Sequence, residues 1–66
     1  MVKRLGTVLK KLRIAKGLTQ EQLGNKVGVS DAYITMLETG ARKNPSLDLL
    51  GRLAKALKVK VGELLE

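Results

Sequence analysis

The segment spanning residues 20–39, QEQLGNKVGVSDAYITMLET, constrains the fold more than any other part of this chain. Within it, Leu23 and Val27 lie four residues apart, and Ile34 and Leu37 lie three residues apart. Both spacings place the paired side chains on one face of an α-helix. The segment therefore predicts two short amphipathic helices, each with one apolar face to bury.

Glycines shape the connection between these predicted helices. Gly28 ends the first helix, and Gly24 offers the small side chain that two closely crossing helices need between them. Gly51, inside a later predicted helix, is a candidate for another close contact. Two helices joined by a turn of about three to four residues with glycine form the shape that places a second helix in the major groove of DNA. The segment points to binding of duplex DNA.

Capping residues mark the ends of the predicted helices. Thr19 and Gln22 form a T-x-x-Q capping box at the start of the first helix of the pair. Ser30 and Ser46 are expected to be the N-caps of the helices that follow them. Gly40 is expected to end the helix that begins after Ser30.

Helical spacing continues on both sides of the pair. Residues 2–16 have apolar positions at a helical period and a basic outer face, and Gly17 is a good C-terminal stop. A helix over residues 47–57 is expected to bury one apolar stripe, made of Leu47, Leu50, Leu53, Ala54 and Leu57. A short last helix over residues 61–65 has a weak start, because Lys60 is not a capping residue. The sequence predicts a compact all-α domain of five helices.

The size and composition of the chain predict one small domain, covering residues 1–66. Hydrophobic residues make up 44% of the chain, enough for a packed core, and that core is aliphatic because Tyr33 is the one aromatic residue. The sequence has no Cys and no His, so we expect no disulfide, no metal and no cofactor. Its 6 acidic residues are spread over different helices and offer no nucleophile–base or acid pair, so an enzyme is not expected.

Positive charge dominates the chain. Lys and Arg number 13 against 6 acidic residues, a formal net charge of +7. This balance favours a polyanionic partner, either nucleic acid or an acidic membrane surface. The membrane surface is the weaker alternative, because the basic N-terminal helix lacks the Trp or Phe that anchor such helices. With no secretory signal or membrane span evident, we expect a cytoplasmic protein in contact with the nucleoid.

Four motifs stand in order at consistent spacings: L-T-Q at 18–20, V-G-V-S at 27–30, I-x-x-x-E-x-G at 34–40 and N-P-S-L at 44–47. Over nearly the whole chain they resemble the lambda repressor and Cro-like helix-turn-helix family, the Xre type. The resemblance implies a five-helix DNA-binding domain and a small, sequence-specific transcriptional regulator, a repressor. It also implies a homodimer on a palindromic double-stranded DNA operator, with no membrane partner.

The resemblance implies roles for individual positions as well. The helix that begins after Ser30 corresponds to the recognition helix, the one that enters the major groove. The side chains expected to face base edges lie at its start and on the same side further along it, at Ser30, Asp31, Ala32, Thr35, Met36 and Thr39. Contacts to the DNA backbone are expected from the opening of the preceding helix and from the following loop, at Gln20, Arg42, Lys43 and Asn44. Arg13 and Glu38 stand at the places of a structural ion pair.

Several positions have alternatives that the sequence leaves open. Asp31 either accepts a hydrogen from cytosine N4 or stabilises the positive end of its helix. Tyr33 either places its hydroxyl on a phosphate or packs against the turn, and Gln20 is also an ordinary first-turn residue. The recognition helix has no Arg, Lys, Gln or Asn for bidentate base contacts. The C-terminal cations, namely Arg52, Lys55, Lys58 and Lys60, are expected to face water away from DNA.

The apolar end of the chain and the function also have two interpretations. Val59, Val61, Leu64 and Leu65 are either core or the contact between two subunits, and we expect part of this set to be shared in the dimer. The same fold also serves as a module for an unknown protein partner, which outward-facing Ala32 and Met36 favour. Selection from random duplex DNA separates the two functions, because no enriched sequence at low salt favours a protein partner.

Overall fold

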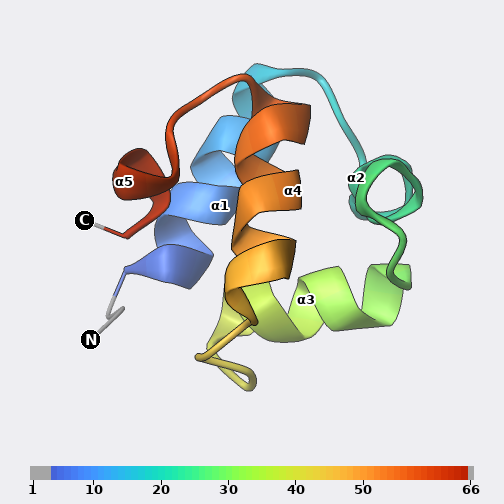
Figure 1. Cartoon of the computed structure of the whole chain (residues 1–66). Helices are drawn as coiled ribbons and strands as arrows, with labels where there is room; N and C mark the ends of the chain where they lie inside the picture. Colours follow the sequence, from blue (N-terminus) through green and yellow to red (C-terminus); the bar gives the residue numbers. More distant parts are fainter. Residues whose placement is uncertain (1–3, 66) are drawn as a thin grey trace.

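A computed structural model describes residues 4–65 of the chain and contains five α-helices in that range (Figure 1). Helix α1 spans Leu5–Ala15, α2 spans Gln20–Val27, α3 spans Asp31–Thr39, α4 spans Leu47–Leu57 and α5 spans Val61–Leu64. The predicted all-α class with five helices is confirmed. The predicted start of the first helix near Val2 lies outside the described residues.

The predicted N-caps of the three middle helices are confirmed. Thr19 Oγ1 accepts the backbone N–H of Gln22 at 3.0 Å, and Gln22 Oε1 accepts the backbone N–H of Thr19 at 2.8 Å. The hydroxyls of Ser30 and Ser46 each accept the backbone N–H three residues further on, at 3.1 Å. These bonds satisfy N–H groups that the first turn of a helix leaves unpaired.

The C-terminal ends differ in quality. Gly28 ends α2 with φ 81°, and Gly40 ends α3 with φ 87°, so both occupy the left-handed region that glycine enters without strain. Lys58 ends α4 in the same region, with φ 59°, at a cost that glycine would avoid. The following helix, α5, has no side-chain N-cap bond from Lys60, and only the carboxylate of Glu63 accepts the N–H of Lys60, at 2.8 Å.

All five helices contribute to one aliphatic core. Its largest fully buried side chains are Leu5, Leu9, Leu23, Ile34, Leu37, Leu53, Leu57 and Leu64. Figure 1 shows α2 and α5 on opposite sides of α4, with α3 lying across its lower end. Each fully buried leucine contributes about 1.5–3 kcal/mol. Leu64 is 0% exposed, so it belongs to the core of the single subunit and is not available for the dimer contact expected of it.

Two predictions about α4 are wrong. Leu47 is 81% exposed, and Leu49, which was not predicted, is buried instead at 7%. Leu47 is the first residue of α4 and does not belong to the core cluster. A Cβ at Gly51 would meet nothing within 4 Å, so this glycine permits no close helix contact.

Close approaches occur at two other glycines. A Cβ on Gly6 of α1 would lie 2.5 Å from the carbonyl oxygen of Leu37 and 2.6 Å from that of Glu38. At Gly24 of α2, a Cβ would lie 2.5 Å from the carbonyl oxygen of Val29, so the predicted need for a small side chain is confirmed. Both helices therefore pack directly against backbone. No helix within residues 4–65 is long and apolar enough to cross a membrane.

Candidate nucleic-acid interface

The turn between α2 and α3 is held by backbone hydrogen bonds. The N–H groups of Gly28 and Val29 both donate to the carbonyl oxygen of Gly24, at 2.8 and 2.9 Å. Gly28 supplies the left-handed residue, and Ser30 then caps α3 two residues later. Because Gly24 has no side chain, the turn lies directly on α2. The two helices therefore form one rigid unit.

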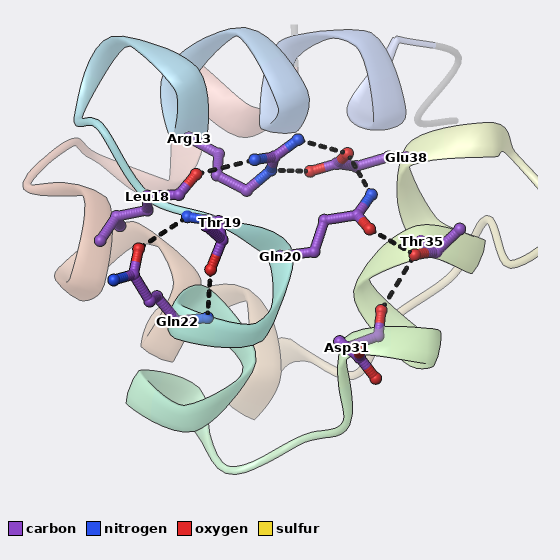
Figure 2. A network of polar contacts seen from close by, with 8 residues as sticks. All are labelled: Arg13, Leu18, Thr19, Gln20, Gln22, Asp31, Thr35 and Glu38. Carbon is purple, nitrogen blue, oxygen red and sulfur yellow. Dashed lines mark hydrogen bonds and ion pairs between the residues drawn. The ribbon is translucent and has the colours of Figure 1, made fainter.

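An ion pair joins the far end of α3 to α1 (Figure 2). Arg13 Nε donates to Glu38 Oε2 at 2.6 Å, and Arg13 Nη2 donates to Glu38 Oε1 at 3.1 Å. Arg13 Nη1 donates to the backbone oxygen of Leu18 at 2.7 Å, in the connection between α1 and α2. The Arg13 and Glu38 side chains are 11% and 3% exposed. The structure thus brings together the two residues that the sequence paired, in a bidentate and nearly buried contact.

Gln20 connects this ion pair to the middle of α3. Its Nε2 donates to Glu38 Oε1 at 3.0 Å, and its Oε1 accepts the hydroxyl of Thr35 at 2.7 Å (Figure 2). Thr35 Oγ1 also lies 3.1 Å from the backbone oxygen of Asp31, one turn earlier. The first residue of α2 is therefore bonded to α3 at two points, and within residues 4–65 only one of its two amide hydrogens is used.

The other side of α3 is open to solvent. Ser30, Asp31, Ala32 and Thr39 are exposed, whereas Thr35 and Met36 are half-buried. Among the positions left open by the sequence, Tyr33 is half-buried and packs against the core. The side chains at the start of α3 are therefore more accessible to solvent than those at Thr35 and Met36, which are partly accessible.

A basic loop follows α3 directly. Arg42, Lys43 and Asn44 are all exposed. The N–H of Arg42 donates to the carbonyl oxygen of Met36 at 3.0 Å, which folds the loop back against the last turn of α3. The loop that carries these cations therefore lies against the C-terminal end of α3, where positive side chains could meet phosphates.

The cations of α4 have other neighbours. Arg52 Nη2 pairs with Asp48 at 2.9 Å, and Arg52 Nη1 lies 3.4 Å from the carbonyl oxygen of Val27. Arg52 and Lys55 line an open groove together with Lys26 and Ala56. This groove lies between α4 and the end of α2, apart from the loop that follows α3.

A family model described as helix-turn-helix matches residues 9–64 of this chain. The chain belongs to the lambda repressor-like helix-turn-helix family of transcriptional regulators. It is 44% identical over 64 residues to the HTH-type transcriptional regulator y4dJ of Sinorhizobium fredii, and the match covers 97% of this chain and 82% of that protein. It is 32% identical over 62 residues to SinR of Bacillus subtilis, and there the match spans only 56% of the relative's length.

Solved structures of this family have the same fold. The N-terminal DNA binding domain of SinR from Bacillus subtilis superposes with a TM-score of 0.89 at 32% identity, covering 96% of this chain and 91% of that chain. Another SinR structure, also at 0.89, is a complex with DNA. The restriction-modification controller protein C.AhdI from Aeromonas hydrophila matches with a TM-score of 0.87 at 40% identity, over 96% of this chain and 94% of its own.

Sequence reasoning missed the bonds that organise this site. Gln20 and Thr35 are 15 residues apart on different helices, and no spacing signal links them. The approach of Gly6 to α3 was also missed, although a glycine inside a helical stretch is a signal for a close contact.

Proposed function

We propose that this protein binds duplex DNA sequence-specifically by inserting α3 into the major groove. One observation carries the proposal: the first turn of α3 is exposed, and the exposed loop with Arg42 and Lys43 lies against the same helix. The likeness to SinR in its complex with DNA supports it. Base edges would face Ser30, Asp31, Ala32 and the partly exposed positions of the next turns, namely Thr35, Met36 and Thr39.

Backbone contacts would come from both ends of the helix-turn-helix unit. The second amide hydrogen of Gln20 is not used by Glu38, and it stands at the N-terminus of α2, where backbone N–H groups also favour an anion. Arg42, Lys43 and Asn44 would hold the phosphates beside the other end of α3. The hydroxyl of Tyr33 is a further candidate at the edge of the helix.

We propose a homodimer on a palindromic operator, and the dimensions of the molecule support this proposal. The subunit measures 26 × 23 × 20 Å, whereas the half-sites of such operators lie about 34–36 Å apart. One subunit therefore reads one half-site, and a second copy is needed for the other. Half-buried Val59 and Val61, with Leu65 at 38% exposure, form the apolar surface that we assign to this dimer contact.

The remaining assignments follow from the same proposal. Residues 1–66 would act as a single DNA-binding domain and, by occupying an operator, as a repressor. A protein with this activity would work in the cytoplasm at the nucleoid. The relatives of this chain are named as transcriptional regulators, and we assign no catalysis to it.

Salt-dependent binding of an operator selected from random duplexes tests the proposal. Each phosphate contact contributes about 0.9 to the slope of log affinity against log salt, so Lys43→Gln should lower the slope by about that amount. Lys55→Gln removes the same charge from the groove beside α4, and we expect its slope to equal that of the unchanged protein. Fluorescence anisotropy measures both variants. No association even at low salt, or equal losses in the two variants, would contradict the proposed interface.

A further inference from the structure

The ion pair fixes the direction of the hydrogen bonds that run from Glu38 through Gln20 to Thr35. An arginine side chain only donates and an ionised carboxylate only accepts, so Glu38 accepts from Arg13. The Gln20 atom next to Glu38 Oε1 must then be the amide nitrogen, which turns the amide oxygen toward Thr35. Because an amide oxygen cannot donate, Thr35 must donate to it.

Thr35 is consequently left without a hydrogen to offer. A hydroxyl has one hydrogen, and both atoms positioned to accept it, Gln20 Oε1 at 2.7 Å and the backbone oxygen of Asp31 at 3.1 Å, belong to the protein. What Thr35 keeps for a base is the accepting capacity of its oxygen and its methyl group. The polar network that holds α3 also sets what Thr35 can recognise.

Most of the other expected base-facing side chains also lack a polar hydrogen to offer. Asp31 lies four residues before Thr35, on the same side of the helix, and its exposed carboxylate only accepts hydrogen bonds. Ala32 and Met36 have no polar hydrogen, and the hydroxyl of Thr39 donates to the backbone oxygen of Met36 at 3.3 Å. Among the expected base-facing side chains, only Ser30, at the cap, keeps a hydroxyl hydrogen that no bond within residues 4–65 uses.

We propose that α3 reads its half-site through acceptors, so that the bases opposite Asp31 and Thr35 present exocyclic amino groups and guanine is excluded there. This inference rests on the proposed function. In the major groove, cytosine N4 and adenine N6 are donors, whereas guanine shows only the acceptors N7 and O6. Cytosine is the expected base opposite Asp31, and adenine or cytosine is the expected base opposite Thr35.

In vitro selection from random duplexes, followed by anisotropy titration, tests this readout. For the unchanged protein, exchanging the preferred cytosine with its paired guanine should weaken binding about tenfold. Asp31→Asn keeps one amide oxygen as an acceptor but adds an N–H donor, so it should weaken the preference for cytosine over guanine. Because a charge that repels phosphates is gone, it should also tighten binding to duplexes that lack the preferred cytosine. Thr35→Val keeps the methyl group and removes the acceptor, so it should abolish the preference at the second position.

Matched controls separate these effects from general ones. Asp48→Asn removes a first-turn carboxylate from α4, and Thr7→Val removes an exposed hydroxyl from α1; neither should change the selected motif. Thermal unfolding checks that the Thr35→Val variant is folded. If it is not, the Asp31→Asn variant still tests the proposal, because Asp31 is exposed.

Each other outcome has a definite meaning. If guanine is enriched at a position that Asp31→Asn alters, the acceptor readout is wrong, although the protein still binds DNA. Identical selected motifs for all variants would lead to the same conclusion. Binding without any enriched sequence would overturn the readout together with the sequence-specific part of the proposed function. No association with any duplex at low salt would overturn the proposed function together with the readout.

Discussion

Replacing Glu38 by alanine should remove a large part of the stability of this domain. The Arg13 side chain is 11% exposed, and without Glu38 its guanidinium keeps only the backbone oxygen of Leu18 at 2.7 Å. The amide nitrogen of Gln20 loses its acceptor in the same change. Removing one partner of a buried ion pair costs about 3–5 kcal/mol, because the other charge remains buried and uncompensated.

The cost is large in relation to the whole fold. Folded proteins are stable by about 0.05–0.15 kcal/mol per residue, so a chain of 66 residues has roughly 3–10 kcal/mol. In a domain of this size, 1 kcal/mol shifts the melting temperature by about 4–8 °C. Glu38→Ala should therefore lower the melting temperature by at least about 12 °C, or leave the protein unfolded at room temperature.

Thermal unfolding followed by far-ultraviolet circular dichroism measures this effect. Asp31→Ala is the matched control, because it removes an exposed carboxylate from the same helix and should cost only about 0.3–1 kcal/mol. The double variant Arg13→Met, Glu38→Leu removes both charges and should be more stable than Glu38→Ala. Equal melting temperatures for Glu38→Ala and Asp31→Ala would refute the reasoning.

The remaining predictions concern backbone and surface. Gly51→Ala should stabilise the domain by about 0.5–1 kcal/mol in urea unfolding, because the added Cβ meets nothing within 4 Å. Gly6→Ala should destabilise it, because the added Cβ would meet two carbonyl oxygens. The opposite order of stabilities would be inconsistent with the packing. Lys58→Gly should raise the melting temperature, because relieving a left-handed lysine is worth about 1–2 kcal/mol and the added freedom of glycine in the unfolded chain costs about 0.5–1 kcal/mol; a fall would show that the strain is negligible. Leu65→Asp should shift the sedimentation mass toward the monomer, and an unchanged dimer would place the contact elsewhere.

Helix boundaries were predictable because their signals are local. The capping box of Thr19 and Gln22 and the capping serines act within one turn, so a few neighbouring residues decide where each helix begins. The αL glycines at the ends of α2 and α3 act in the same way. The pairing of Arg13 with Glu38 was also anticipated, through the resemblance to a family rather than through spacing.

Buried positions were harder to predict where the core ends. A helical period indicates which residues share a face, but it does not show how far the neighbouring helices extend. For that reason Leu47 was expected in the core and Leu49 was not, although the structure has them the other way round. The glycines follow the same rule, since the packing of α1 on α3 decides that Gly6 and not Gly51 is the close approach.

Composition, charge and motif order were enough to assign this chain to a small all-α helix-turn-helix domain, because each of these patterns depends only on the order of residues along the chain. The direction of the hydrogen bond from Thr35 to Gln20 is different in kind. It depends on a carboxylate from the end of α3 and a guanidinium from α1 meeting beside the start of α2. Only packing brings these groups within about 3 Å of one another, and with it decides which atoms the recognition helix keeps for DNA.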